Sequence, residues 1–588
     1  MFQAFPLQHK RMTRLSLPFI SVGVCEVMNC ATRDHMSSFT VHNTRNRGAH
    51  LAATGSSSSS SSSHFEAAAP PLTLSVPFMS EVVAGGLCDS FTGNYCSRYI
   101  GKYLARALSI HSVLPEGIAQ LRRELKDDPI IDLLMAAHSR ERLLHSRKSH
   151  ADKKTPQGVS RVFSEREMQQ YAMFADNAFM NACRANEMVG GLNDKLVLRN
   201  SEAANSGCRA VWFTATVAPV ALQERRQERR REVDQGGTAP PPIRWETKAK
   251  GCEDSVKECK GTAPTSPFCL DVLVSNVGDS RAFGIARNTL TSEARSILDA
   301  TREHVVPLSS DHKPLRTLEL RRILSAGGVV RSDLGDIIDG NPFYNVSRSF
   351  GHWSMKCDSQ RPPSEQKMIA LPACCSWEMT PGDVLVLSNH AIFETRCQEE
   401  SSMDEIAKVV VREIDRGASP EEAAAALCNY AIRFGAEHSL QVMVAVATSA
   451  DSAQAPCEAK KQEWIVPGPI YAEPCRRSPE YRNALQADCE RCALSLAELL
   501  GLRWRQVRNL IPSRHFLPLM TYYGKECSVL QQIMDEEALL FSHESLPPCG
   551  CSDDVLMEYD EAHMMRAFER IAKSLMSPCT LSTAESGG

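Results

Sequence analysis

The chain has 588 residues, of which 43% are hydrophobic and 23% charged, and its 66 Lys and Arg nearly balance its 70 Asp and Glu. These proportions are typical of a globular protein and exclude a wholly disordered, collagenous or coiled-coil chain. The net charge of −4 gives no global attraction to nucleic acid or to anionic membranes, and the sequence has no apolar run of the roughly 18 residues that a transmembrane helix needs. We therefore expect neither nucleic acid nor a membrane as a partner.

The chain contains 22 scattered cysteines, and no convincing secretory signal precedes them. This pattern favours reduced, buried thiols in an intracellular compartment, with the cytoplasm preferred and mitochondria or the nucleus left open. The mitochondrial alternative depends on Lys10, Arg11 and Arg14, because residues 1–25 contain no acid. The competing interpretation is that residues 15–24, rich in β-branched side chains, form a strand.

Two segments in the first half of the chain are predicted to be insertions. Residues 43–71 include a run of serines, Ser56 to Ser63, that cannot bury enough apolar surface to form a core. Residues 221–267 begin with an arginine cluster and continue with many Gly and Pro residues. Between these insertions, residues 97–125 and 165–188 have helical spacing of their apolar side chains.

The second half begins with strand patterns and ends with helical ones. Residues 269–287 read as two strands around a turn, and residues 383–388 and 441–447 read as buried strands. Helices are predicted over residues 402–415 and 419–433, so the domain is of the α+β class. The expected organisation, in chain order, is an N-terminal segment 1–17, a domain 18–448, a linker 449–475 and a helical C-terminal region 476–588.

Four blocks of sequence, in order, resemble the metal-dependent Ser/Thr protein phosphatases of type 2C. Residues 276–282 read NVGDSRA, residues 308–314 read LSSDHKP and lead to AGGV at 326–329, residues 345–351 read NVSRSFG, and residues 381–388 read PGDVLVLS. The resemblance covers roughly residues 18–448. It implies a four-layer α-β-β-α sandwich of two antiparallel sheets, with a helical C-terminal extension here.

The resemblance also implies a site at one end of the sandwich, where carboxylates hold two Mg²⁺ or Mn²⁺ ions and a bridging water attacks the phosphorus. Asp89 matches one ligand position and Asp279 also remains, so both are candidate remnants of a metal site. Other positions are degenerate, because they carry residues that cannot supply the expected ligand. These positions are Ser37, Ser38, Ser90, Phe91, Asn389 and His438. Phe393 stands at the position of a third-metal acid, with Glu394 one place further on.

The loss of carboxylates decides the functional hypothesis. Two divalent ions about 4 Å apart repel by roughly 17 kcal/mol at an effective dielectric constant of about 20, and several carboxylates normally offset this. We therefore expect a pseudophosphatase without a metal cofactor, acting as a binding or regulatory module for a protein, phosphoproteins included. The alternatives are an active, divergent Mg²⁺- or Mn²⁺-dependent phosphatase and a scaffold subunit that docks through its C-terminal helices.

Three further site hypotheses remain open at this stage. Asp89, His390 and His438 are candidate ligands of a single transition metal, because imidazole suits such ions. Arg33 is the main candidate for binding a phosphate group, with Arg348 and the pair His312–Lys313 as additional candidates. The alternative for Asp279, Arg281, His312 and Arg348 is a structural role in turns and strand ends. The acids Asp333, Asp336 and Asp339 are candidates for supplying uncounted carboxylates.

The C-terminal region matches no family that its motifs would identify. Its cysteines include the pair Cys489 and Cys492 and the pair Cys549 and Cys551, but the first pair lies in a helical pattern. We expect buried thiols there rather than zinc ligands. The apolar stripes of residues 494–510 and 557–576 predict helices that pack on the domain or on a partner.

Overall fold

The computed structural model describes the greater part of the folded elements of the chain. The described residues are 9–17, 19–27, 36–43, 49–51, 72–74, 82–92, 95–111, 163–189, 205–217, 269–287, 305–394, 402–436, 438–448, 460–468, 479–510, 546 and 560–576. Arg33, the serine run 56–63, the insertion 221–267 and the cysteines Cys549 and Cys551 lie outside these residues.

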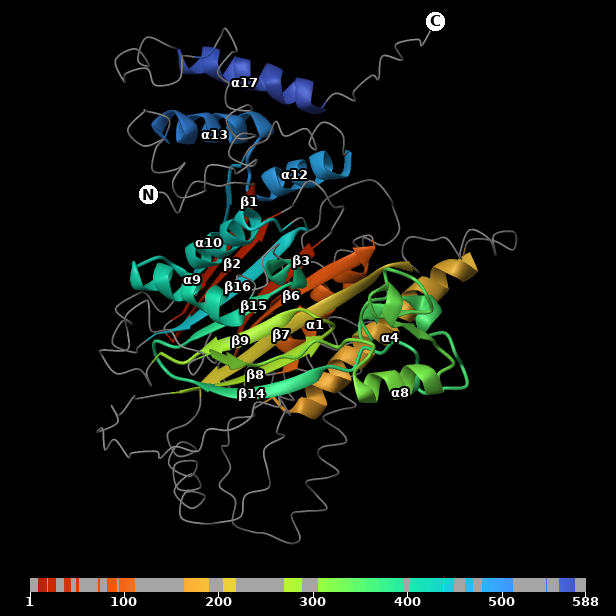
Figure 1. The fold of residues 1–588 in the computed structure, drawn as a ribbon. Helices are drawn as coiled ribbons and strands as arrows, with labels where there is room; N and C mark the ends of the chain where they lie inside the picture. The colour runs from red at the N-terminus through yellow and green to blue at the C-terminus, as the bar shows by residue number, and fades with distance from the viewer. Residues whose placement is uncertain are drawn as a thin grey trace, which may run out of the picture.

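Two antiparallel sheets form the centre of the molecule (Figure 1). The first sheet has seven strands in the order β10 (Val305–Pro307), β9 (Arg281–Ile285), β15 (Val384–Ser388), β16 (Leu440–Ala447), β2 (Ile20–Val27), β1 (Lys10–Ser16) and β17 (Lys460–Val466). The second has the order β14 (Ala373–Met379), β8 (Leu270–Val277), β7 (Gly207–Val217), β6 (Val82–Thr92) and β3 (Met36–Asn43), and β13 (Phe350–Gly351) pairs with β7.

Helices cover the outer face of each sheet. On the first sheet lie α9 (Met403–Asp415) and α10 (Pro420–Arg433), and on the second lie α1 (Tyr95–His111) and α4 (Glu165–Val189) (Figure 1). Gly23 allows β2 and α10 to pack closely, because a Cβ at this position would lie 2.0 Å from the backbone nitrogen of Glu421. The predicted four-layer sandwich of the α+β class is therefore confirmed.

The core between the two sheets follows the alternation of side chains along each strand. Leu87 of β6 and Val211 of β7 point into the space between the sheets, where they pack with Leu385 and Met443 of the other sheet. Their neighbours Cys88 and Ala210 face the opposite way, toward α1 and α4. Because side chains alternate with a period of two, Asp89 and Arg209 also lie on the inner face, one step beyond the apolar core.

Short elements complete the domain. The described helix α8 (Thr317–Ser325) precedes a small two-stranded sheet of β11 (Val330–Arg331) and β12 (Ile337–Ile338), and a second small sheet joins β4 (Ala49–Leu51) to β5 (Leu72–Leu74). The described residues also form short 3₁₀ helices, namely η4 (Ser332–Leu334), η5 (Trp353–Met355), η6 (Pro363–Glu365) and η7 (His390–Phe393).

The predicted linker, residues 449–475, contains strand β17, which extends the first sheet. Strand β17 pairs antiparallel with β1, with Lys10 opposite Val466, and Arg11 lies 3.3 Å from Asp488. Beyond β17, α12 (Pro479–Arg491), α13 (Leu496–Leu510) and α17 (Glu561–Met576) share a core that includes Cys489 and Trp504. Cys489 is buried as predicted, whereas Cys492 is only half-buried.

The strand boundaries differ from two predictions. A single strand was expected over residues 15–24, but β1 ends at Ser16 and β2 begins at Ile20, with a hydrogen bond of 3.0 Å from the Leu17 amide to the Ile20 carbonyl. The sequence places Pro18 between them, and proline lacks the amide that a sheet ladder needs. The sheet also runs past the predicted domain bounds 18 and 448, because β1 and β17 both belong to it.

The sequence has no apolar run long enough for a transmembrane helix. Within the part of the chain that the structure describes, none of the helices has the length and apolar character needed to span a bilayer.

Candidate functional site

The site begins with a cross-strand pair at the end of the inner face. Asp89 of β6 and Arg209 of β7 are direct partners in the antiparallel register. Their side chains approach to 4.0 Å, between the Asp89 Oδ2 and the Arg209 Nη1, and both are almost fully buried. Opposite charges directly across an antiparallel pair attract each other. The sheet itself therefore places a guanidinium next to the carboxylate that the sequence singled out.

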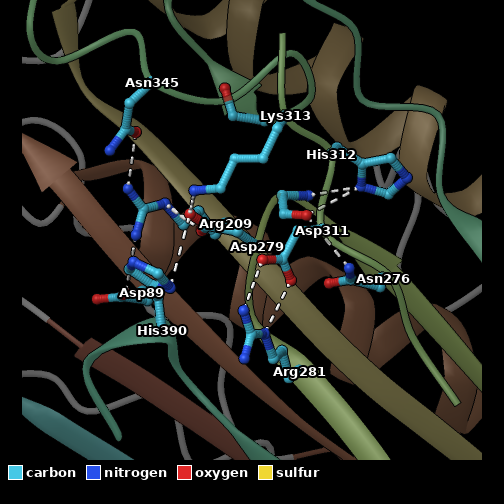
Figure 2. Close-up of polar contacts among 12 residues, drawn as sticks. Asp89, Arg209, Asn276, Asp279, Arg281, Asp311, His312, Lys313, Asn345 and His390 are labelled. Carbon is cyan, nitrogen blue, oxygen red and sulfur yellow. Dashed lines mark hydrogen bonds and ion pairs between the residues drawn. The ribbon is translucent and has the colours of Figure 1, made fainter. Parts of the chain in front are cut away.

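A tight turn brings a second carboxylate to the same guanidinium. The turn between β8 and β9 holds Gly278 at φ +108°, and a Cβ there would meet the Arg209 side chain at 2.9 Å. The next residue, Asp279, is fully buried, and its Oδ1 lies 2.9 Å from the Arg209 Nε. Arg209 therefore lies between Asp89 and Asp279, as Figure 2 shows.

Two more basic side chains surround Asp279. Lys313 donates a hydrogen bond of 2.6 Å to the Asp279 Oδ2, and the His390 Nδ1 lies 3.9 Å from the same oxygen. Burial alone would raise the pKa of Asp279, but Arg209, His390 and Lys313 outweigh it and hold that pKa well below its usual range. Asp279 therefore stays ionised, and nitrogen cations already surround its carboxylate.

The turn is fixed by His312, which explains how Lys313 reaches Asp279. The His312 amide donates to the Gly278 carbonyl at 2.9 Å, and the Gly278 amide donates to the His312 Nδ1 at 3.2 Å. Burial lowers the pKa of His312 to about 3, so its ring is neutral and can accept that hydrogen bond. Asn276 also donates to the Gly278 carbonyl, at 3.2 Å.

The charged residues around the turn are engaged with one another. Arg281 makes two hydrogen bonds to Asp311, of 3.0 and 2.9 Å, and its guanidinium lies 4.3 Å from the ring centre of Phe393. Arg348 binds Glu319 and donates to the Leu371 carbonyl at 2.9 Å. A structural role for Asp279, Arg281, His312 and Arg348 stays a prediction, and these contacts are compatible with it.

Asn389 uses its side-chain amide to join two strand ends. Its Nδ2 donates to the Ser439 carbonyl at 2.8 Å, and its Oδ1 accepts from the Gln441 amide at 3.0 Å. A carboxylate has no proton with which to make the first of these bonds. Asn389 is buried, so both of its polar groups need these partners.

Glu394 joins the two histidines of the site. The His390 Nε2 lies 3.0 Å from its Oε1, and the His438 Nε2 lies 3.3 Å from its Oε2. Burial raises the pKa of Glu394, but the hydrogen bond and charge of His390, together with His438, lower it below its ordinary value. His390 and His438 thus meet at Glu394, whereas the carboxylate of Asp89 faces Arg209.

The remaining predicted residues contribute less to this cluster. Ser38 lies half-buried on β3, and Ser90 points away from Asp89 because neighbours on a strand face opposite sides. Ser37 and Phe91 lie in β3 and β6, but their side chains are outside the described part of the structure. Asp333 pairs with Arg331 and Asp339 with Lys367, so neither supplies a carboxylate to the site.

Arg209 is the residue that the sequence reasoning missed. It stands in the strand GCRAVWFTATV, where it is a long charged side chain among mostly apolar residues. A buried charge without a partner is costly, so this arginine was a signal that an acid lies nearby.

The residues do not fit the two-metal centre that the resemblance implied. A divalent ion about 4 Å from Arg209 or Lys313 would be repelled by about 8 kcal/mol from each cation at an effective dielectric constant of about 20. Within the described ranges, no three His, Cys, Asp or Glu side chains are arranged to hold a metal ion. The single-metal hypothesis of Asp89, His390 and His438 stays a prediction, although these donors face other partners.

Part of the chain is similar to known proteins of the protein phosphatase 2C family. Residues 223–440 match the family model described as protein phosphatase 2C. A probable protein phosphatase 2C of Caenorhabditis elegans is 33% identical over 131 residues, which are 22% of this chain and 31% of that protein. Protein phosphatase 2C 1 of Paramecium tetraurelia is 34% identical over 155 residues, 26% of this chain and 44% of that protein. The chain thus spans less than half the length of these curated relatives.

Solved structures were compared as well. A phosphatase from a pathogenic strain of Toxoplasma gondii has a TM-score of 0.43 and 17% identity, covering 77% of this chain and 99% of that one. A serine-threonine phosphatase 2C from Toxoplasma gondii has a TM-score of 0.38 and 14% identity, covering 75% of this chain and 98% of that one.

Proposed function

We propose that the part of the chain that resembles protein phosphatase 2C forms a domain that has lost metal-dependent hydrolysis and acts as a binding or regulatory module for a protein partner. The observation that carries the proposal is the position of Arg209 between Asp89 and Asp279. In this arrangement a side-chain cation neutralises the carboxylates that would otherwise attract a divalent ion.

The chemistry of these cations explains why hydrolysis would be lost. A divalent metal lowers the pKa of a bound water and so generates a nucleophile at neutral pH. Arginine stays protonated in proteins and coordinates no water in this way. Lys313 donates its hydrogen bond to Asp279 and does not replace the metal in this role. Arg209 and Lys313 therefore supply positive charge without an activated water.

The test is phosphatase turnover of the purified full chain on a phosphothreonine peptide, with Mn²⁺ and Mg²⁺ titrated to millimolar levels. Calorimetric titration of Mn²⁺ in the same buffer measures binding directly. We expect no turnover above that of the Asp89→Ala variant, and no saturable Mn²⁺ binding in the micromolar range. Turnover that requires metal and disappears in Asp89→Ala would contradict the proposal and favour an active, divergent phosphatase.

The second alternative is a scaffold that docks through the C-terminal helices. The apolar residues of α13 and α17 pack largely on each other, since Trp504 and Phe568 lie 6.2 Å apart within one core. The scaffold alternative therefore carries less support than binding through the sandwich. Deletion of residues 476–588 tests it, because this deletion leaves β17 paired with β1, and the loss of a copurified partner would support the scaffold.

A further inference from the structure

The outer face of α8 is unusually apolar for a surface helix. Leu318 is 76% exposed and Leu324 is 53% exposed, whereas Glu319 and Ile323 on the opposite face are buried. A helix that packs on a core by one face normally presents polar residues on the other. The sequence TLELRRILS instead places two leucines in water.

The exposed apolar residues gather in one segment. Among the described residues, six large hydrophobic side chains are strongly exposed, and five of them lie between residues 315 and 343. These five, together with Arg321, are here called the α8 surface: Leu315, Leu318, Arg321, Leu324, Val329 and Phe343. Contiguous exposed apolar patches mark protein interaction sites.

Backbone hydrogen bonds and a small core hold this segment together. The Gly328 amide donates to the Ile323 carbonyl at 2.9 Å, which turns the chain back at the end of α8 toward Val329. The Asp339 amide donates to the Val329 carbonyl at 2.7 Å, and β11 pairs with β12. Ile323, Ile338, Met355 and Met368 form a small core beneath it.

The charge on this surface indicates the chemistry of the partner. Arg321 stands between Leu318 and Leu324 and makes no hydrogen bond or ion pair with any described residue, whereas Arg322 binds Glu319 and Arg331 binds Asp333. Asp336 likewise makes no hydrogen bond or ion pair with any described residue, but it lies in the loop before β12 and not on α8. An exposed arginine flanked by leucines is complementary to a carboxylate flanked by apolar side chains.

We propose that the α8 surface docks an amphipathic segment of a partner protein, with apolar side chains at helical spacing and a carboxylate that pairs with Arg321. The inference rests on the proposed function only in that a binding module needs a docking surface. Lys313, whose ammonium contacts Asp279, lies two residues before Leu315, so the partner would sit at the edge of the cluster around Arg209.

The experiment selects ligands without prejudging their sequence. A phage library of random peptides of about 16 residues, roughly four helical turns, is selected on the immobilised full chain. The variant Leu318→Ser/Leu324→Ser serves for counterselection. We expect enriched peptides with leucine-like residues at spacings of three and four and with net negative charge. Fluorescence anisotropy of these peptides should show binding at least tenfold weaker to the double variant.

Two further variants make the result specific. Leu502→Ser removes an exposed leucine of α13, outside the α8 surface, and should leave peptide affinity unchanged. Arg321→Glu should lower the affinity for acidic peptides by at least tenfold. The same variant should bind versions of these peptides in which lysine replaces the acidic residue. All substituted positions are exposed, so thermal unfolding of each variant should match that of the unmodified chain.

Three outcomes would overturn the inference. Enriched peptides that bind the double variant equally well would show that the α8 surface is not their site. If the enriched peptides lack acidic residues, or if none of them depends on Leu318 and Leu324 for binding, the partner does not have the proposed chemistry. A dimer in sedimentation experiments that Leu318→Ser dissociates would show that a second copy covers the surface. Phosphatase turnover is measured separately, so an active enzyme would refute the proposed function without affecting these outcomes.

Discussion

The Arg209 Nε lies 2.9 Å from the Oδ1 of Asp279, a carboxylate that is fully buried. Asp279 follows the β8 strand and Arg209 stands on the neighbouring strand β7, so the pair joins a turn to the sheet behind it. The same guanidinium lies 4.0 Å from the Asp89 carboxylate. Its Nη2 also donates a hydrogen bond of 3.0 Å to the Asn345 Oδ1. The Arg209 guanidinium thus lies close to both of the acids that the sequence singled out.

Replacing Arg209 by methionine should make the site more attractive to a divalent ion. Arg209→Met keeps an unbranched side chain but leaves Asp89 and Asp279 without that cation, and breaking a buried pair typically costs about 3–5 kcal/mol of unfolding free energy. Mn²⁺ should recover part of this loss, because a ligand at 100 times its Kd stabilises the folded state by about 2.7 kcal/mol. Urea unfolding with and without about 1 mM Mn²⁺ measures both the loss of stability and its recovery by the metal.

The matched control is Arg281→Met, which breaks the ion pair with Asp311 on the same strand–turn unit. It should lose stability without gaining any response to Mn²⁺. An equal response of both variants, or none in Arg209→Met, would refute the idea that Arg209 excludes divalent ions.

The two asparagines near the site should respond in opposite ways to conversion into aspartate. Asn389→Asp replaces the amide that donates to the Ser439 carbonyl by a carboxylate, so we expect a loss of about 1–3 kcal/mol that grows as pH rises. Asn345→Asp places a carboxylate where the Arg209 Nη2 already donates, so it should be neutral or stabilising. The unfolding free energies of both variants, measured at about pH 5 and about pH 8, test both expectations. A stabilised Asn389→Asp would indicate that the site still recruits a cation.

The sequence was informative about the fold wherever a segment carried its own pattern. The strands predicted over residues 383–388 and 441–447 are β15 and β16, and the helices predicted over 402–415 and 419–433 are α9 and α10. Continuous apolar runs and helical periodicity are local properties, so they can be read without knowing which strands pair. Strand β17 was missed, because its pattern KKQEWIV is mostly polar and is stabilised by pairing with β1.

The candidate site could be predicted only in part. Asp89 and Asp279 were found because sequence motifs mark them, and the structure brings both to Arg209. Arg209 belongs to no such motif and becomes significant only through the register that pairs it with Asp89. The grouping of His390, Glu394 and His438 likewise depends on how η7 sits beside β16, which a linear sequence does not specify.

The close contact between β2 and α10 should make Gly23 intolerant of any side chain. A Cβ at Gly23 would lie 2.0 Å from the Glu421 nitrogen, and the clash is with backbone, which cannot rotate away. We expect Gly23→Ala to destabilise the domain by at least about 3 kcal/mol, the upper part of the range for overpacking. The control Gly501→Ala meets Phe568 at an ordinary 3.4 Å within helix α13 and should be neutral or stabilising. Thermal unfolding of the two variants compares them, and a well-folded Gly23→Ala would contradict the packing of α10 on β2.

Glu319 should account for part of the acid sensitivity of the domain. Burial raises its pKa, but hydrogen bonds and charges from Arg348 and Arg322 outweigh this and lower the pKa from 4.5 to about 2. Because the folded-state pKa is depressed, the stabilisation is present above the ordinary value of 4.5 and is lost as pH falls toward 2. A shift of this size corresponds to about 3 kcal/mol. Glu319→Gln should therefore be less stable than the unmodified chain at pH 7 and should approach it at about pH 2.5, below the unfolded value. Urea unfolding across this range tests the prediction, and two curves that stay parallel would show that the stabilisation from Glu319 does not depend on its charge.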